Sequence, residues 1–330
     1  MRKGQRSTTL SRRRLLGLSG AVLALPAWSR LAQAASYPAR PVRLVVGYAP
    51  GGATDITARV IAERLFDRLG QQFIVENRPG AATNIATEQV IRATPDGYTL
   101  LMASGANAIN ATLYDNLNFD FVRDIAPIAG IAKTPFVVIV PASFPVKTLQ
   151  EFIAYLKANP GKINMASGGI GTSPHVCGEL FQIMTGTKMV HVPYRGNYMS
   201  DLLAGQVHVV FNPIAQALPL IHDGKLRALG VTTAKRSAAL PDVPAIGEFV
   251  KDYDAFGWYG LGAPSKTPPE IIKKLGDAMN SALADPNVTA RFSQLGVEPM
   301  PLNSAGFAKH IAEEAEKWAK VIEAQSIKLN

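Results

Sequence analysis

The chain has 330 residues, of which 47% are hydrophobic and 18% charged, a composition typical of an α/β protein large enough for two domains. Its formal net charge of +9 would favour an acidic partner, but seven basic residues and no acidic residue fall in residues 1–34. Without that segment the chain has 27 basic and 25 acidic side chains, so we expect no nucleic-acid partner. The one cysteine, Cys177, excludes an intramolecular disulfide and lies in a helical apolar pattern, which predicts a buried, inert thiol.

Residues 1–34 have the features of an export signal. A basic start precedes a short apolar stretch and then Ala32-Gln33-Ala34, a cleavage site of the small-x-small kind. The sequence SRRRLL at 11–16 is similar to the twin-arginine signal, although a general secretory signal is the alternative. A retained membrane anchor is disfavoured because two glycines and a proline interrupt the apolar stretch. We predict cleavage near Ala34 and a mature protein in the periplasm.

Strand-like apolar runs alternate with amphipathic helical stretches from Pro41 onward, which indicates parallel α/β units. In the first cycle we expect strands at 42–49, 71–77, 98–104, 125–131 and 136–141, and helices at 55–69, 84–93 and 148–158. In the second cycle we expect strands at 163–167, 189–194, 207–212, 226–233 and 256–264, and helices at 176–185, 198–204, 215–223, 269–283, 286–295 and 304–325.

The two cycles predict two α/β domains. The sequence Met-Ala-Ser-Gly ends a strand in each cycle, at 102–105 and at 165–168, which supports two similar domains. We expect residues 35–135 and 256–330 to form domain 1 and residues 136–255 to form domain 2. Such a clamshell has a crevice at the carboxyl ends of its strands, where ligands of open α/β sheets bind.

A short phrase occurs twice, as PGGATDI at 50–56 and as PGAATNI at 79–85. Each copy follows an apolar run and opens a helical stretch, so its backbone N–H groups suit an anion. A plain turn with a helix N-cap is the favoured reading of either copy alone, whereas the repetition in neighbouring units favours binding. Because the charge of Asp55 would repel a carboxylate, we expect that side chain to be an N-cap.

A third turn, at 167–175, is rich in glycine and in hydrogen-bond donors. It lacks the spacing of a dinucleotide fingerprint, and the chain has no phosphate-binding P-loop, so a small acid fits better than a nucleotide. His175 is either a ligand donor or a packing histidine. Tyr194 or the neighbouring Arg195, and Asn212, follow strands and are further candidates. Phe256, Trp258 and Tyr259 are more typical of core or hinge packing.

Motifs for catalysis are absent from the sequence. It contains neither His-Glu-x-x-His nor Gly-x-Ser-x-Gly, and its five histidines lack the spacing of metal ligands. A nucleophile–base pair of Ser167 or Ser173 with His175 has no evident acid partner. We therefore expect no enzymatic activity, no metal and no cofactor.

The chain resembles the tripartite tricarboxylate transporter receptor family, also called Bug receptors. The resemblance covers nearly all of the mature chain. It is carried by the export signal and by YPARPVR at 37–43, PGGATD at 50–55, ENRPG at 76–80, the stretch 171–181 with Gly171, Thr172, His175 and GELF, VHVPY at 190–194, DLL at 201–203, GKLRAL at 224–229, LPDVP at 240–244, WYGL at 258–261 and AP at 263–264.

This resemblance implies a type II-like Venus flytrap, a two-domain periplasmic binding protein with a ligand cleft between the domains. It implies that the loops at 50–55 and 79–84 hold one carboxylate and that the loop at 167–175, with the Tyr194 and Asn212 regions, selects the rest of the ligand. This chain has Asn212 where family members often have Asp, and Tyr198 and Met199 where small residues are common.

We therefore expect a monomeric periplasmic receptor that binds a small organic acid and works with membrane transporter subunits. An exported enzyme and a sensory receptor for a membrane kinase are the alternatives. The residues that we expect at the ligand are Tyr48, Pro50, Gly51, Gly52, Thr54, Asp55, Gly80, Ala81, Ala82, Asn84, Ser104, Ser167, Gly169, Gly171, Thr172, His175, Tyr194 and Asn212.

Overall fold

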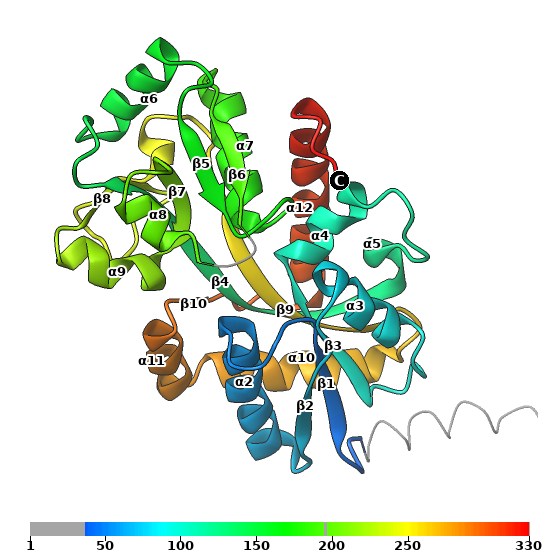
Figure 1. Ribbon diagram of the computed structural model, residues 1–330. Helices are drawn as coiled ribbons and strands as arrows, with labels where there is room; N and C mark the ends of the chain where they lie inside the picture. The colour runs from blue at the N-terminus through cyan, green and yellow to red at the C-terminus, as the bar shows by residue number, and fades with distance from the viewer. Residues whose placement is uncertain (1–36, 195–196, 330) are drawn as a thin grey trace, which may run out of the picture.

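The structure, a computed structural model, describes residues 37–194 and 197–329 (Figure 1). The export signal predicted at 1–34 and the candidate Arg195 lie outside the described residues. Among the helices of the described ranges, none has both the length and the apolar character needed to cross a bilayer.

The first domain is built on a sheet with the strand order β2-β1-β3-β9-β4. Its strands are β1 (Val42–Val46), β2 (Phe73–Asn77), β3 (Thr99–Ser104), the first part of β4 (Ile125–Pro141), β9 (Phe256–Pro264) and the short β10 (Glu298–Pro299). Its helices are α2 (Ala53–Leu69), η2 (Ala81–Thr83), α3 (Asn84–Ile91), α4 (Gly105–Leu113), α5 (Phe121–Asp124), α10 (Pro269–Leu283), α11 (Pro286–Gln294) and α12 (Ser304–Ala324). Because β1, β2 and β3 run parallel, the turns that follow them meet at one edge of the sheet.

The second domain is built on a sheet with the strand order β4-β7-β5-β6, and β8 also pairs with β4. Its strands are the last part of β4, β5 (Asn164–Ser167), β6 (Val190–Pro193), β7 (Val209–Pro213) and β8 (Leu226–Val231). Its helices are α6 (Leu149–Ala158), α7 (Ser173–Thr185), α8 (Met199–Leu203), α9 (Ile214–His222) and η3 (Ile246–Glu248). The parallel trio β6, β5 and β7 again brings strand ends and helix starts to one edge.

One long strand, β4, belongs to both sheets. Its residues up to Pro135 pair with β9, and from Phe136 onward it pairs with β7 and β8. Two separate strands were expected here, and this prediction was wrong. The intervening residues 132–135 continue the ladder with β9, so the chain stays extended through them. Figure 1 shows β4 and β9 running between the two groups of elements.

Several helices differ from the sequence expectation. α4 and α5 were not predicted, because α4 is a nine-residue segment rich in alanine and asparagine and α5 contains only four residues. α7 begins at Ser173 rather than at Val176, since a proline is well tolerated in the first turn of a helix. α2 begins at Ala53 with Gly52 as its N-cap, so the N-cap role expected for Asp55 was also wrong.

The core contains the large buried side chains of both domains. Trp258, Trp318 and Tyr253 are fully buried, and so is Cys177, as predicted. Burial raises the pKa of the Cys177 thiol, which keeps it protonated and unreactive. The sequence pattern therefore predicted the environment of the cysteine correctly.

The long C-terminal helix α12 joins several parts of the fold. It packs against β4 and α4 of the first domain and contacts α7 of the second. The buried Glu314 of α12 accepts hydrogen bonds from the indole N–H groups of Trp258, at 3.1 Å, and Trp318, at 2.8 Å. These bonds fix the orientation of Trp258.

Candidate ligand-binding site

A cavity of about 310 Å³ lies between the two domains. The first domain contributes Tyr48, Ala82, Ser104, Gly105 and Ala106, and the strands β4 and β9 contribute Thr134, Phe136, Gly257, Trp258 and Tyr259. The second domain contributes Ile170, Gly171, Thr172, Ser173, Pro174 and Pro213. Its volume is at the small end of the range for ligand pockets, and none of these described lining residues carries a charged side chain.

The N-terminus of α4 opens into this cavity. Ser104 is the N-cap, and its backbone N–H donates to Asn107 Oδ1 at 2.8 Å, which fixes the start of the helix. The N–H groups of Gly105 and Ala106 have no intrahelical acceptor, because the first four N–H groups of an α-helix lack one. The end of α4 therefore presents free donors and a partial positive charge to the cavity.

Two hydroxyl groups lie beside this helix end. Tyr48 Oη and Ser104 Oγ are 3.2 Å apart, and both residues line the cavity. Burial raises the pKa of Tyr48 to about 12, so its hydroxyl is neutral and remains a donor near pH 7. The first-domain wall thus combines neutral hydroxyls with backbone N–H groups.

The second copy of the repeated phrase forms an unusual left-handed turn. Ala81, Ala82 and Thr83 have positive φ angles of 44°, 49° and 82°, a conformation that costs L-residues free energy. Surrounding groups hold it, since Asn110 Nδ2 donates to the Ala82 carbonyl at 2.6 Å and Asn107 Nδ2 donates to Thr83 Oγ1 at 3.1 Å. The wall around Ala82 is therefore strained but firmly supported.

The first copy of the phrase has a different role. Asp55 is buried and accepts hydrogen bonds from the guanidinium of Arg59, from the Gly51 N–H at 2.9 Å and from Asn77 Nδ2 at 2.9 Å. Burial alone would raise the pKa of Asp55, but these hydrogen bonds outweigh it and hold the pKa below its ordinary value. Because Asp55 takes the Gly51 N–H, this donor is not free for a ligand.

One lining residue leaves a polar atom without a partner. Thr134, on β4, is 8% exposed, and its Oγ1 has no hydrogen-bond partner in the described structure. Thr134 and Phe136 flank Gly257 of β9, where a methyl group would lie 3.2 Å from the Phe136 ring. A buried hydroxyl without a partner is costly, and in this cavity the Thr134 hydroxyl has a donor to offer to a ligand.

Two histidines, His175 and His191, support the second-domain loop at 167–175. His175 is buried and its Nδ1 accepts the Gly171 N–H at 3.1 Å, while its Nε2 lies 3.4 Å from Glu179 Oε1. The His191 ring stacks on His175 with centroids 3.6 Å apart, and its Nε2 lies 2.7 Å from Ser167 Oγ. Burial and the neighbouring His175 lower the pKa of His191 to about 3, so it is neutral near pH 7.

Other polar side chains of this wall also have protein partners. Thr172 Oγ1 donates to the Gly169 carbonyl at 2.8 Å, and the Tyr194 hydroxyl donates to Asp201 at 2.7 Å. Asn212 is 0% exposed, and its Oδ1 accepts the Tyr198 hydroxyl at 2.7 Å. The Asn212 amide oxygen, which we expected to bind the ligand, therefore already accepts a hydrogen bond from Tyr198.

The structure brings only part of the expected residues to the cavity. Tyr48, Ala82, Ser104, Gly171 and Thr172 line it. The others do not line it: Pro50, Gly51, Gly52, Thr54, Asp55, Gly80, Ala81, Asn84, Ser167, Gly169, His175, Tyr194 and Asn212. Of these, the residues at 50–52 are exposed at the surface, whereas Ser167, His175 and Asn212 are buried behind the second-domain wall.

Sequence reasoning missed several lining residues. Thr134 and Phe136 were not considered, and Trp258 and Tyr259 were assigned to packing. Their signal in the sequence is weak, because an apolar strand residue looks the same in a core and in a cavity wall. Gly105 and Ala106 would have followed from the helix start after Ser104, which was not predicted.

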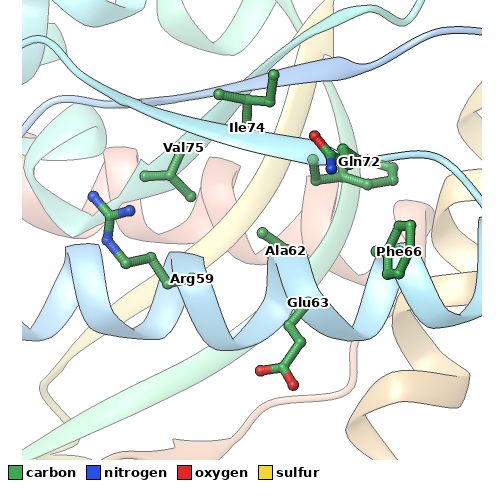
Figure 2. A pocket seen from close by; sticks show the side chains of 8 residues that line it. Arg59, Ala62, Glu63, Phe66, Gln72, Ile74 and Val75 are labelled. Carbon is green, nitrogen blue, oxygen red and sulfur yellow. The ribbon is translucent and has the colours of Figure 1, made fainter.

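A second hollow, of about 410 Å³, lies between α2 and the edge strand β2 (Figure 2). Its rim carries the exposed side chains of Phe66, 47% exposed, and Ile74, 48% exposed. The guanidinium of Arg59 lies beside it but is already bound to Asp55. Since it is formed by the middle of a helix and a strand, no helix N-terminus faces it, and we do not assign the ligand to it.

Within residues 37–194 and 197–329, no group of three or more His, Cys, Asp or Glu side chains is arranged to hold a metal ion.

Two α/β domains that share the strand β4 and enclose a cavity form the architecture of a two-domain periplasmic binding protein, a class that includes the similar solved structure of BugD. Residues 57–327 match the model of the tripartite tricarboxylate transporter family receptor, and the chain belongs to this family of solute-binding receptors.

Individual relatives are similar over nearly the whole chain. A protein of Cupriavidus necator described as the UPF0065 protein in the gbd 5' region is 40% identical over 92% of this chain and 93% of its own length. A Rhodopseudomonas palustris protein solved with adipate is 34% identical, with a TM-score of 0.76 over 88% of this chain and 99% of that one. MatC of the same organism, solved with bound malate, is 30% identical, with a TM-score of 0.73 over 87% and 100%.

Proposed function

We propose that this protein is a periplasmic receptor that captures a small carboxylated organic acid in the cavity and presents it to the membrane subunits of a tripartite tricarboxylate-type transporter. The observation that carries this proposal is the free N-terminus of α4 beside the Tyr48 and Ser104 hydroxyls. This end of the cavity offers donors and partial positive charge, which suit a carboxylate. The similar structures that hold adipate and malate support an acid as the ligand.

In this proposal the carboxylate accepts hydrogen bonds from Gly105 N–H, Ala106 N–H and one of the two hydroxyls, since the other hydroxyl donates to the first. Ser173 of the second domain comes close to the same place, since a methyl group at Gly105 would lie 3.4 Å from Ser173 Oγ. The unpartnered Thr134 hydroxyl is a further donor in the wall. Closure of the two domains would then replace the hydration shell of the acid by protein donors.

The remaining features of the proposal come from the sequence and the family. We propose export by a twin-arginine-like signal cleaved near Ala34, a monomeric protein, and binding without turnover. We propose domain limits at 35–135 with 256–330 and at 136–255. The change of strand partners at Phe136 and the start of β9 at Phe256 support these limits.

Calorimetry and thermal melting would test the receptor function. The purified protein is unfolded, freed of small molecules, refolded and titrated with a panel of organic acids and their uncharged amides. We expect at least one acid to raise the melting temperature while its amide does not, since a ligand stabilises only the state that it binds. Recovery of the acid unchanged, checked by NMR, separates a receptor from an enzyme. Stabilisation by a neutral sugar and by no acid would overturn the proposal.

A further inference from the structure

The helix N-termini at this cavity lie close together: α4 begins at Gly105 and α7 at Ser173, and Ser173 Oγ would lie 3.4 Å from a methyl group at Gly105. The α4 N-terminus carries roughly half an elementary charge, concentrated at its first turn. Gly105, Ala106, Tyr48 and Ser104 gather there. One carboxylate fits this set of donors. A second carboxylate on the same small ligand would have to find its partners elsewhere in the wall.

The rest of the wall is largely apolar. Phe136 lies on β4 and Trp258 on β9, and Ile170, Pro174 and Pro213 are contributed by the second domain. Pro174 stands in the first turn of α7 and removes one of the N–H groups that this helix could otherwise offer. The indole N–H of Trp258 is used by Glu314. These residues present rings and aliphatic surface to the ligand.

The polar side chains of the second domain do not change this balance. Ser167, Thr172, His175 and Asn212 each have a hydrogen-bond partner within the protein. The Ser173 hydroxyl, which lines the cavity, lies near Gly105 and so adds to the donors at the α4 N-terminus. A second carboxylate would therefore lose its water without gaining a charged partner among the described lining residues. An uncompensated buried charge is strongly unfavourable.

We infer that the ligand carries a single carboxylate and an apolar body, so that the protein selects aromatic or short aliphatic monocarboxylic acids over dicarboxylic and tricarboxylic acids. The carboxylate lies at the α4 N-terminus, and the apolar body packs against Phe136, Trp258 and Ile170. The inference rests on the proposed function, because it specifies which acids the receptor takes.

Matched pairs of acids test this selectivity by calorimetry at pH 7. Hexanoate is compared with adipate, and benzoate with terephthalate, so that each pair differs by one carboxylate on the same body. We expect each single acid to bind about tenfold or more tightly than its partner, since the second charge is left unpaired. From butanoate to hexanoate, each methylene should tighten binding by about fourfold through burial of apolar surface.

The outcomes separate this inference from the proposed function. Tighter binding of adipate and terephthalate would overturn the single-carboxylate inference and leave the receptor function intact. Equal affinity for acetate and hexanoate would contradict the inference that an apolar body of the ligand packs against the wall. Binding of hexanamide and benzamide as tight as that of the acids would overturn the proposed function itself. Binding of none of these compounds would overturn the inference, and the wider acid screen would then decide the function.

A variant at the apolar wall gives a second test. Ile170 is half-buried in the second-domain loop, so Ile170→Lys places a cation opposite the α4 N-terminus. We expect this change to shift the preference from hexanoate toward adipate by about tenfold or more, because hydrogen bonds to charged groups are strong. Ile183→Lys, at a residue of α7 that is 40% exposed and outside the cavity, is the matched control and should keep the wild-type preference. An unchanged preference in Ile170→Lys, with the fold retained by circular dichroism, would contradict the assigned orientation.

Discussion

The first-domain wall of the cavity leaves donors free, whereas the second-domain wall uses similar donors to hold its own loop. In the first domain the N–H groups of Gly105 and Ala106 have no helical acceptor. In the second domain the Gly171 N–H donates to His175 and the Thr172 hydroxyl donates to Gly169. The two walls therefore differ in how much hydrogen bonding a ligand can still gain.

A hydrogen-bonding residue in a glycine-rich loop is therefore not by itself a ligand contact. The internal partners of the second-domain loop fix its shape, and its contribution to binding is then the surface of Ile170, Pro174 and Pro213 together with the Ser173 hydroxyl near Gly105. The first domain supplies the polar recognition. Four predictions, in order of decreasing effect, test this division.

The largest effect is expected at the α4 N-terminus. Ala106→Asp places a carboxylate beside the proposed ligand carboxylate, and two like charges about 4 Å apart repel by about 4 kcal/mol at an effective dielectric constant of 20. We expect calorimetry to show loss of acid binding. Ala106→Asn is the matched neutral control and should retain most of the affinity. If both variants bind acids equally well, the carboxylate does not lie at this helix end.

The next effect is expected at the unpartnered hydroxyl in the wall. Thr134→Val should weaken acid binding by about 1.5–3 kcal/mol, the range for a hydrogen bond to a charged group. The same change should keep or raise the stability of the free protein, because it removes a buried hydroxyl that has no partner.

Thr185→Val provides the control for this pair of readouts. The buried Thr185 hydroxyl donates to the Phe181 carbonyl at 2.6 Å, so its removal should lower the free energy of unfolding and leave acid binding unchanged. Chemical denaturation and calorimetry measure both quantities. If Thr134→Val lowers the free energy of unfolding but not the acid affinity, the Thr134 hydroxyl does not contact the ligand.

A smaller effect, on stability alone, is expected in the second-domain wall. Tyr198→Phe leaves Asn212 Oδ1 buried without its donor, which should lower the free energy of unfolding by about 1–3 kcal/mol. Acid affinity should not change, since this pair does not line the cavity. Tyr155→Phe, at a hydroxyl that bonds no described residue, should change neither. A large affinity change in Tyr198→Phe would place polar recognition in the second domain as well.

Near neutral pH the effect of His191 is the smallest of the four, because its titration lowers the stability only as the pH falls. Burial and His175 lower the pKa of His191 to about 3 in the folded protein, whereas an unfolded histidine titrates near roughly 6.5. Between these values the unfolded chain binds a proton that the folded chain does not, so stability should fall as the pH is lowered from about 6.5 toward 3. Melting temperatures of the ligand-free protein at pH 7 and pH 4 measure this loss.

His191→Gln isolates this contribution, because glutamine keeps an N–H donor for Ser167 but does not titrate. We expect a smaller drop in melting temperature between pH 7 and pH 4 than in the wild type. His222→Gln, at an exposed position of α9, should show the wild-type drop. Equal drops in all three proteins would exclude His191 as a source of the pH dependence.

Most of the fold was predictable from the sequence, because apolar periodicity and glycine or proline turns mark the elements strongly. The limits of β9 and α10 agree with the predicted ranges, and the two-domain α/β fold is confirmed. The continuity of β4 was not predictable, since it depends on pairing with β9, a strand more than a hundred residues further along the chain.

The site was predictable only in part. The repeated phrase predicts two helix starts, yet the chain cannot show that Asp55 consumes the donor of the first copy. Similarly, the sequence predicted His175 and Asn212 as ligand contacts, but their partners within the protein become apparent only when β5, β6 and β7 come together. Thr134 and Trp258 belong to the wall because two sheets meet there, which is a property of tertiary structure.

The strands β4 and β9 carry both the link between the domains and part of the cavity wall. An occupant that touches Phe136 and Trp258 therefore touches the segments about which the domains would rotate. Ligand occupancy and the angle between the domains are then coupled through a single equilibrium. A membrane partner that recognises only the closed angle could distinguish loaded from empty receptor without contacting the acid.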